Sequence, residues 1–234
     1  MREFLSMRWR DLLFAHWAVD PGIVERALPD GVSIDTYEGE AYLGVVPFVM
    51  SDIRLRGSPI GLSFSELNLR TYVTVDGTPG VYFFNLDADD RVGVRLARSL
   101  FRLPYYRAGM RVDANGSGRN RRITFRSRRL TSGVPPARFE ARYGPEGSFS
   151  EPEPGSLDSF LTERYRFYTA DDRGRLYRGD IAHEPWRLAP ARADVGRNGL
   201  FDANGFDRPA GEPRLRFAAP IDVTADRVRR VRPA

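Results

Sequence analysis

The sequence predicts a mainly β (α+β) protein in which antiparallel strands form a barrel of acetoacetate decarboxylase-like type or a strongly curled sheet, with two or three short helices. Segments rich in β-branched and aromatic residues recur along the chain, separated by turn residues. Glu38-Gly39 and Asp76-Gly77 are each flanked by two such segments, which is typical of hairpins. Closing the sheet would leave no exposed edges and would create a central cavity. We expect residues 1–234 to form one domain.

The N-terminal part is predicted to contain a strand, a short helix and a hairpin. The first strand lies around Trp9 to Trp17. Asp20 before a proline is typical of an N-cap, which predicts a helix over Pro21 to Leu28. Strands over Ser33 to Tyr37 and Glu40 to Val49 then pair across the Glu-Gly turn.

A second hairpin is predicted in the middle of the chain. Leu67 to Val75 pairs with Gly80 to Leu86 across the Asp-Gly turn. Over Asp90 to Phe101, apolar residues share one face at helical spacing, so we expect a second helix there. Further strands are expected at Arg107 to Val112, Arg121 to Leu130 and Ala137 to Tyr143.

The C-terminal part is predicted to contain one more helix and three strands. Ser156 caps a turn of helix that runs toward Glu163. The strands are Tyr165 to Thr169 paired with Leu176 to Ile181, and a last one over Leu215 to Val223.

Composition excludes several chemistries. The chain has no lysine and no cysteine, so all 36 basic residues are arginines. Arginine cannot lose its proton to form a Schiff base, and thiolate nucleophiles, thiolate metal sites and disulfides are excluded. With only His16 and His183, a three-histidine zinc site cannot form. Because glycine-rich phosphate loops are also missing, we expect no metal and no cofactor.

The charge pattern does not favour a nucleic-acid partner. The formal net charge is +5, but 31 acidic residues are interspersed with the arginines. Arg119 to Arg129 is the one locally basic stretch, and it alternates as a strand does. We interpret it as a solvated sheet face, with an anionic partner surface as the alternative. The start of the chain has no secretory signal and no run is long enough to span a membrane, so we expect a cytoplasmic protein.

Large polar side chains are concentrated in the segment Phe64 to Tyr72. Strand alternation places Glu66, Asn68, Arg70 and Tyr72 on one face. If this face is interior, Arg70 could hold a substrate carboxylate while Glu66 orients it or transfers a proton. The alternative is a structural Glu–Arg pair on an exterior face.

Two other segments carry candidate site residues. Tyr105 and Tyr106 point to opposite sides of an extended chain, so one of them faces the interior, and the sequence leaves open which. His183 and Trp186 flank a proline that ends a strand. His183 is a candidate general acid or base, although a histidine satisfied by a backbone carbonyl is an alternative.

Several of these segments together resemble a known family. The strings WRDLLFAHWAVDP, AYLGVVPFVM, ELNLRTYV, PGVYFFNLDA, LARSLFRLPYY and YRGDIAHEPW occur in this order across nearly the whole chain. They are similar to the YqjF-like family of uncharacterised bacterial and archaeal proteins. That family is thought to resemble acetoacetate decarboxylase in fold, which implies a β-rich closed barrel with a central pocket and no established reaction.

The resemblance to the decarboxylase also implies matching positions. Glu66 matches a strand glutamate, Leu96-Ala97-Arg98 a helix segment, and Pro104 a proline that precedes the lysine of the Schiff base. Tyr105 stands where that lysine would be. Because the chain has no lysine, we do not expect imine-based decarboxylation.

Two functions remain open. The first is an enzyme acting on a small carboxylate- or carbonyl-bearing molecule, in which Glu66, Tyr105 or His183 transfers a proton. The second is a non-catalytic domain that binds or senses a small molecule. In both, the residues expected to hold the ligand are Asn68, Arg70, Tyr72, Tyr106 and Trp186. The sequence does not give the ligand or the oligomeric state.

Overall fold

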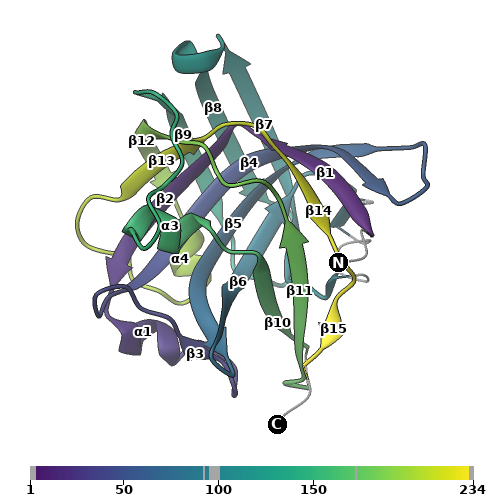
Figure 1. Cartoon of the computed structure of the whole chain (residues 1–234), viewed down its shortest axis with the longest axis vertical. Coiled ribbons are helices and arrows are strands. Elements are labelled where there is room, and N and C mark those ends of the chain that lie inside the picture. The colour runs from purple at the N-terminus through teal and green to yellow at the C-terminus, as the bar shows by residue number, and fades with distance from the viewer. Residues whose placement is uncertain (1–3, 92, 95–100, 172, 232–234) are drawn as a thin grey trace.

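The computed structural model describes residues 4–91, 93–94, 101–171 and 173–231. Most of them form strands of one strongly curled sheet (Figure 1). No helix in this part of the chain is both long and apolar enough to cross a membrane. The strands are β1 (Leu5–Arg10), β2 (Leu12–Val19), β3 (Ser33–Ile34), β4 (Ala41–Leu55), β5 (Leu62–Val75), β6 (Thr78–Ala88), β7 (Tyr105–Asn115), β8 (Arg122–Arg129), β9 (Arg138–Pro145), β10 (Arg166–Ala170), β11 (Leu176–Ala182), β12 (Leu188–Asn198), β13 (Arg214–Ala218), β14 (Ile221–Ala225) and β15 (Arg229–Arg230).

The sheet closes into a ring. Its strand order is β1-β14-β11-β10-β6-β7-β8-β9-β12-β13-β2-β4-β5-β3, and β1 also pairs with β4. Among the described strands, all pairings are antiparallel except those of β6 with β7 and with β10, which are parallel. The mainly β, strongly curled fold is therefore confirmed, and the two parallel neighbours of β6 are a feature that the sequence did not predict.

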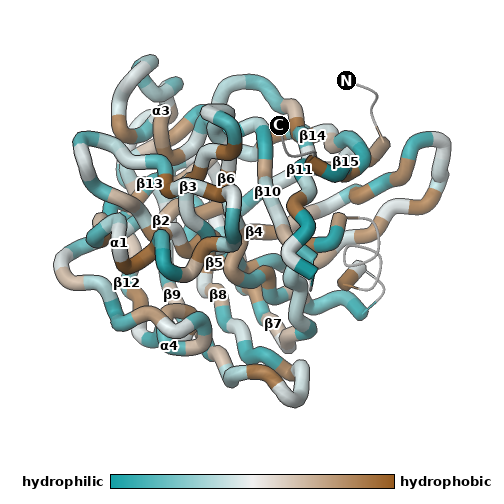
Figure 2. Tube along the Cα trace, turned by 90° about the horizontal axis from the view of Figure 1, so that it is seen from below, coloured by the Kyte–Doolittle hydropathy of each residue, from teal (hydrophilic) through white to brown (hydrophobic). Residues whose placement is uncertain are grey.

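Strands β2, β4 and β5 lie between two hydrophobic cores. Residues such as Phe14 and Val46 face the first core, whereas Leu13 and Val45 face the second. Strands β8 and β9 cover the second core from its other side. Figure 2 shows hydrophobic stretches along the strands in the middle of the molecule, with mostly hydrophilic loops around them. Burial on both faces explains why β4 reads as one long apolar run.

The strand predicted around Trp9 to Trp17 is confirmed as extended structure, but it is two strands, because the chain breaks at Asp11 between β1 and β2. Asp11 lies at the break with a left-handed φ of 55°, a conformation that aspartate tolerates better than most residues. Its buried carboxylate accepts hydrogen bonds from Arg10 and from both Nε and Nη2 of Arg121, at 2.7 to 2.9 Å. These contacts hold the turn.

The two predicted hairpins have different outcomes. Asp76 and Gly77 have φ values of 49° and 70° and join β5 to β6, so that hairpin is confirmed. Glu38 and Gly39 also form a turn, with φ values of 52° and 87°, but only a bridge between the two flanking residues closes it. The predicted pairing is wrong, because β3 pairs with β5.

Two of the predicted helices are confirmed. In α1 (Pro21–Glu25), the Asp20 side chain accepts a hydrogen bond from the Gly22 amide, and the helix ends before the predicted Leu28. In α3 (Leu157–Thr162), Ser156 accepts from the Ser159 amide. The helix predicted over Asp90 to Phe101 lies largely outside the described residues.

The C-terminal part differs from the prediction in several ways. The expected strand over Leu215 to Val223 is two strands, β13 and β14, interrupted at Pro220, which has no amide hydrogen for the ladder. Strand β12 and the short helix α4 (Leu200–Ala203) were not predicted. Strand β12 escapes notice because arginine, aspartate and glycine interrupt its apolar residues.

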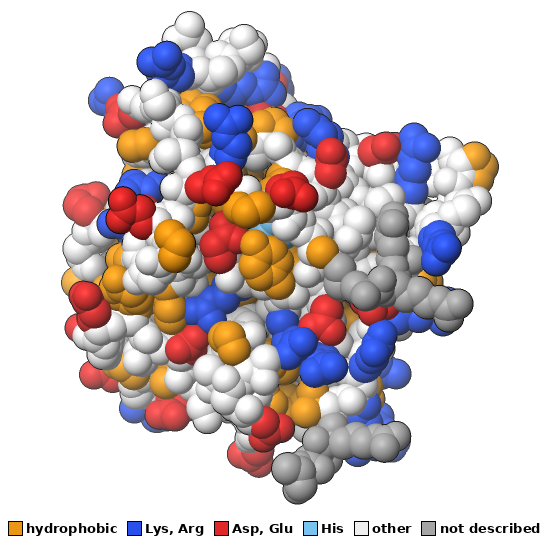
Figure 3. All heavy atoms as spheres, in the orientation of Figure 1, with side chains coloured by type: hydrophobic (Ala, Val, Ile, Leu, Met, Phe, Trp, Pro, Cys, Tyr) orange, Lys and Arg blue, Asp and Glu red, His pale blue; other side chains and the backbone are white. Residues whose placement is uncertain are grey.

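The basic stretch lies on an outer sheet face, as interpreted from its alternation. Arg122 and Arg128 are exposed, while Ile123 and Phe125 fill the second core. Arg129 is the exception, because it turns inward and pairs with Asp87 of β6. On the face drawn in Figure 3, basic and acidic side chains are interspersed.

Candidate functional site

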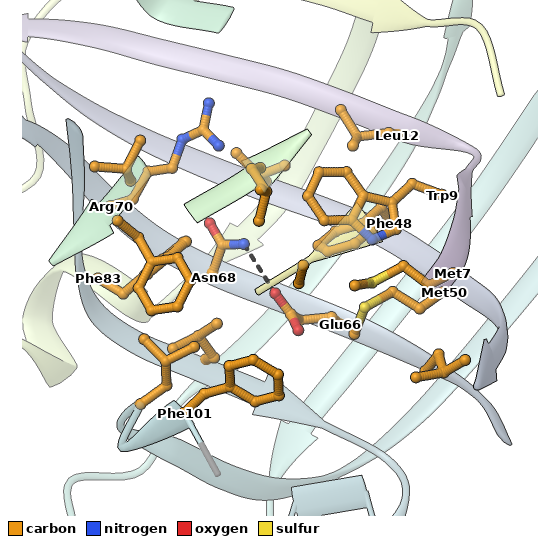
Figure 4. Close-up of a pocket in the computed structure, with 18 of the residues that line it drawn as sticks. Met7, Trp9, Leu12, Phe48, Met50, Glu66, Asn68, Arg70, Phe83 and Phe101 are labelled. Atoms are coloured by element: carbon orange, nitrogen blue, oxygen red, sulfur yellow. Dashed lines mark hydrogen bonds between the residues drawn. The ribbon is translucent and has the colours of Figure 1, made fainter. Parts of the chain in front are cut away.

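A cavity of about 140 Å³ lies inside the first core. Its walls come mainly from β1, β4, β5 and β6, and most of its lining is aromatic or aliphatic (Figure 4). The polar side chains that line it are Glu66, Asn68, Tyr105, Thr162, Arg70, Arg164, Arg166 and His183. The cavity is therefore an apolar space with a small set of polar groups, as small-molecule sites usually are.

Strand alternation and one β-bulge direct these side chains inward. On β5, Glu66, Asn68 and Arg70 line the cavity, and the leucines between them belong to the second core. The face of β5 that carries these three polar residues is thus an interior one. On β6 the bulge leaves Phe84 without a cross-strand partner, because Leu69 pairs with Asn85 and Arg70 with Phe83. The extra residue shifts the alternation.

Glu66 is the buried acid of the cavity, with an exposed fraction of 3%. The Tyr105 hydroxyl donates to its Oε2 at 2.5 Å, and the Asn68 amide donates to its Oε1 at 3.1 Å. Burial raises the pKa of Glu66 to about 7, against the opposing effects of these hydrogen bonds and of Arg70. Near neutral pH both its protonation states are populated, which suits a general acid or base.

Arg70 lies at another part of the cavity wall and has no carboxylate partner among the described residues. Its Nη2 donates to the Tyr72 hydroxyl and to the Leu161 carbonyl, each at 3.1 Å. Its guanidinium carbon is 5.1 Å from the centre of the Phe14 ring. The alternative of an exterior Glu–Arg pair is therefore wrong: the face is interior, and Glu66 bonds to Tyr105 and Asn68 instead.

The other two arginines of the cavity wall are already neutralised. Arg164 pairs with Asp35 at 2.7 Å, and Arg166 pairs with Asp180 at 2.5 Å. Of the three lining arginines, Arg70 alone has no acidic partner in the part of the chain that the structure describes.

Tyr72 lies behind Arg70 and is not on the cavity wall. Its hydroxyl is 2.6 Å from the Leu161 carbonyl and 2.6 Å from His16 Nε2. Because the carbonyl can only accept, Tyr72 donates to Leu161, and His16 donates from a protonated Nε2. Burial, followed by Arg70 and Arg214, lowers the pKa of His16 well below its usual value, so the ring is neutral. His16 was not among the predicted site residues, although Leu12, Phe14 and His16 alternate onto one face.

Gly44 of β4 makes room for this arrangement. A Cβ atom at this position would lie 2.7 Å from His16 Cδ2 and 3.4 Å from Arg70 Cγ. We therefore expect Gly44→Ala to lower the free energy of unfolding by about 1–3 kcal/mol, as overpacking of a core does. Denaturant unfolding measures this loss. Gly196→Ala in β12 is the control, since nothing lies within 4 Å of its Cβ position. Equal losses in the two variants would contradict the prediction.

The adjacent tyrosines separate as alternation requires. Tyr105 lines the cavity and bonds to Glu66. Tyr106 points away, with its ring centre 4.4 Å from the guanidinium carbon of Arg129. The structure thus answers which tyrosine faces inward, and we leave Tyr106 out of the site that we propose.

His183 and Trp186 lie together on the cavity wall. His183 Nδ1 is 2.6 Å from the Glu184 carbonyl, so this nitrogen carries the proton. Burial lowers the pKa of His183, which leaves Nε2 as an acceptor. The His183 ring centre is 4.9 Å from that of Trp186, which stacks on Trp9 at 6.1 Å. Among the described residues, no hydrogen bond joins His183 to Glu66.

Unpaired polar atoms gather around the cavity. Within the described part of the chain, few buried side-chain nitrogen or oxygen atoms lack a hydrogen-bond partner. Four of them belong to residues of the cavity wall, namely Trp9 Nε1, Asn68 Oδ1, Arg70 Nε and His183 Nε2. An unpaired buried polar atom is costly, so these four atoms need hydrogen-bond partners from water or from a bound molecule.

Comparison with known proteins agrees with this fold. The model of the DUF2071 family, described as an uncharacterized conserved protein, matches residues 6–222. The chain belongs to the DUF2071 family. The chain is also similar to the uncharacterized protein YqjF of Bacillus subtilis (strain 168). The two are 43% identical over 222 residues, which cover 94% of this chain and 89% of YqjF. The resemblance to YqjF-like proteins is thereby confirmed.

Solved structures similar to this DUF2071 protein have the acetoacetate decarboxylase-like fold. The enduracididine biosynthesis enzyme MppR complexed with pyruvate has a TM-score of 0.67 at 15% identity, covering 97% of this chain and 90% of its own. An acetoacetate decarboxylase has a TM-score of 0.64 at 13% identity, covering 99% of this chain and 90% of its own. At such identities the similarity establishes the fold alone.

Proposed function

We propose that this DUF2071 protein binds a small carboxylic acid in its cavity and that Glu66 transfers a proton to or from it. The carboxylate binds Arg70. The observation that carries the proposal is an arginine of the cavity wall, Arg70, that has no carboxylate partner among the described residues, in an apolar cavity that also holds a buried acid.

The charge of Arg70 is the reason to propose an anion. A cation next to apolar walls is poorly solvated, and a bound carboxylate would supply both charge and hydrogen-bond acceptors. The aromatic contacts of Arg70 with Phe14 and Tyr72 leave Nε unpaired among the described residues. Tyr72 and the Leu161 carbonyl hold the guanidinium through Nη2, so they position it for a ligand.

Glu66 is the proton-transfer group of the proposal. It lies four residues before Arg70 on the same strand, so their Cα atoms are roughly 13 Å apart. A ligand held at Arg70 would extend past Asn68 toward Glu66. Tyr105 positions the carboxyl group through its hydrogen bond, and the acceptor Nε2 of His183 is a second proton-transfer candidate. MppR, which has the same fold, is described as complexed with pyruvate, a small keto acid.

The reaction proposed is proton transfer next to a carbonyl or carboxylate and not imine chemistry, because the chain has no lysine. The second candidate is a domain that binds or senses the same acid without changing it. The tyrosine at the position that resembles the decarboxylase's lysine favours this candidate. Incubation with a ligand that binds, followed by product analysis, distinguishes the two.

A thermal-shift screen with small keto acids, hydroxy acids and aromatic acids tests the anion site. A ligand at 100 times its dissociation constant is expected to add about 2.7 kcal/mol of stability. Arg70→Met is expected to abolish this gain. Arg111→Met is the matched control, because Arg111 is exposed and pairs with Asp113 on the outer sheet face. Equal stabilisation of wild type and Arg70→Met would refute the proposal.

A further inference from the structure

We infer that the acid bound in this cavity carries a single aromatic ring as its apolar body. The carboxylate part of this inference rests on the proposed function. The ring part rests on the size of the cavity and on the chemistry of its walls, and it can be tested separately.

The cavity has the volume of one ring. An engineered protein cavity of about 150 Å³ lined by aliphatic and aromatic side chains stays dry and binds benzene. The cavity described above measures about 140 Å³. A phenyl group is therefore of the size that this cavity accommodates.

Aromatic side chains of the cavity wall contact one another in stacked and edge-on pairs. Trp9 stacks on Trp186 with an interplanar angle of 23°, and it meets Phe48 edge-on at 64°. Phe14 meets Trp186 at 88°. Aromatic pairs prefer offset-stacked or edge-to-face contacts, so a ring bound beside these side chains can extend the cluster in either geometry.

The opposite wall is aromatic as well. In Figure 4, Trp9 and Phe48 lie on one side of the cavity, Phe83 and Phe101 lie on the other, and Glu66 lies between them. The thioethers of Met7 and Met50 line the same space and make favourable contacts with ring edges. Rings on opposite walls favour a flat guest over a flexible one.

A ring is also favoured over an alkyl chain by entropy. An alkyl chain of equal size must lose the freedom of several rotatable bonds when it is ordered, whereas a phenyl ring has none to lose. Arg70 lies on the wall of this aromatic space, so a carboxylate separated from the ring by a short linker can reach it.

Calorimetric titration with three probes tests the inference. The probes are toluene, phenylacetate and octanoate, and the two acids have the same number of non-hydrogen atoms. We expect phenylacetate to bind roughly tenfold more tightly than octanoate. Toluene is expected to bind more weakly than phenylacetate. In Arg70→Met the affinity for phenylacetate should fall while that for toluene stays unchanged.

Phe48→Leu tests the aromatic wall directly. This variant is expected to lose most of the roughly tenfold preference for phenylacetate over octanoate. Phe125→Leu is the control, because it removes a buried phenyl ring from the second core, away from the cavity. It should keep the preference. If either variant fails to fold, titration of the wild-type protein with the three probes still tests the inference.

The outcomes separate the two parts. If octanoate binds as tightly as phenylacetate, the inference of an aromatic ring is overturned and the anion site stands. If toluene binds as tightly as phenylacetate and Arg70→Met has no effect on either affinity, the carboxylate site at Arg70 is overturned and the site for the ring stands. No binding of any probe to the folded protein would overturn both.

Discussion

Replacing Arg129 with methionine is expected to destabilise the protein by about 3–5 kcal/mol, because it leaves the Asp87 carboxylate buried without its partner. The two side chains are each 1% exposed, and they form a bidentate pair through Arg129 Nε and Nη2 at 2.8 and 3.2 Å. Burial raises the pKa of Asp87 and Arg129 opposes that rise, so the loss of Arg129 should raise this pKa further. Denaturant unfolding at neutral pH measures the loss.

Arg126 provides the matched control for this prediction. It lies on the same strand and pairs with Glu140 at 2.8 Å, but its side chain is 43% exposed. Exposed pairs contribute little, so Arg126→Met should cost less than about 1 kcal/mol. The double variant Asp87→Asn with Arg129→Met should recover part of the loss, since it removes the unpaired charge. A cost for Arg129→Met as small as that for Arg126→Met would show that the inner pair does not stabilise the fold.

Replacing Glu66 with glutamine is expected to change how stability depends on pH. The pKa of Glu66 is raised from 4.5 to about 7 in the folded protein, so between these values the folded state holds a proton that the unfolded state releases. The stability that this carboxyl contributes is therefore greatest at low pH and decreases as pH rises through 7. Between pH 5 and pH 8 the wild type should lose about 2–3 kcal/mol relative to Glu66→Gln.

The difference between the stability curves of the wild type and of Glu66→Gln isolates the contribution of Glu66 to the pH dependence. The lowered pKa of His16 acts in the opposite sense, reducing stability as pH falls below about 6.5, but it acts on both proteins alike. Chemical unfolding at a series of pH values gives the two curves. Glu140→Gln serves as the control for exchanging a carboxylate for an amide, because this side chain is 47% exposed and does not line the cavity. Parallel curves for Glu66→Gln would mean that Glu66 titrates as it does in water.

Strand alternation made part of the site predictable. It places Glu66, Asn68 and Arg70 on one face of β5, and the structure has that face on the cavity. Alternation could not say whether Tyr105 or Tyr106 faces inward, because a shift of one residue reverses the answer. The same rule would have found Arg129, which follows Ile123 and Phe125 onto the buried face of β8.

Other features depend on contacts between distant segments. The residues of the Glu38-Gly39 turn predict its shape but not that β3 would pair with β5. The bulge at Phe84 appears only in the pairing of β6 with β5, since nothing in the local sequence requires it. Similarly, the break at Asp11 depends on Arg121, which is more than a hundred residues away.

The closure of the ring bears on how this chain folds. Strand β1 lies between β4 and β14, so one side of it can pair soon after synthesis, whereas the other side must await a strand more than two hundred residues later. Such long-range pairing slows folding, because the entropy of closing the loop is lost before the contacts form. During translation β1 therefore keeps an open edge until β14 leaves the ribosome. The cavity wall that includes Met7 and Trp9 can be completed only in that last step.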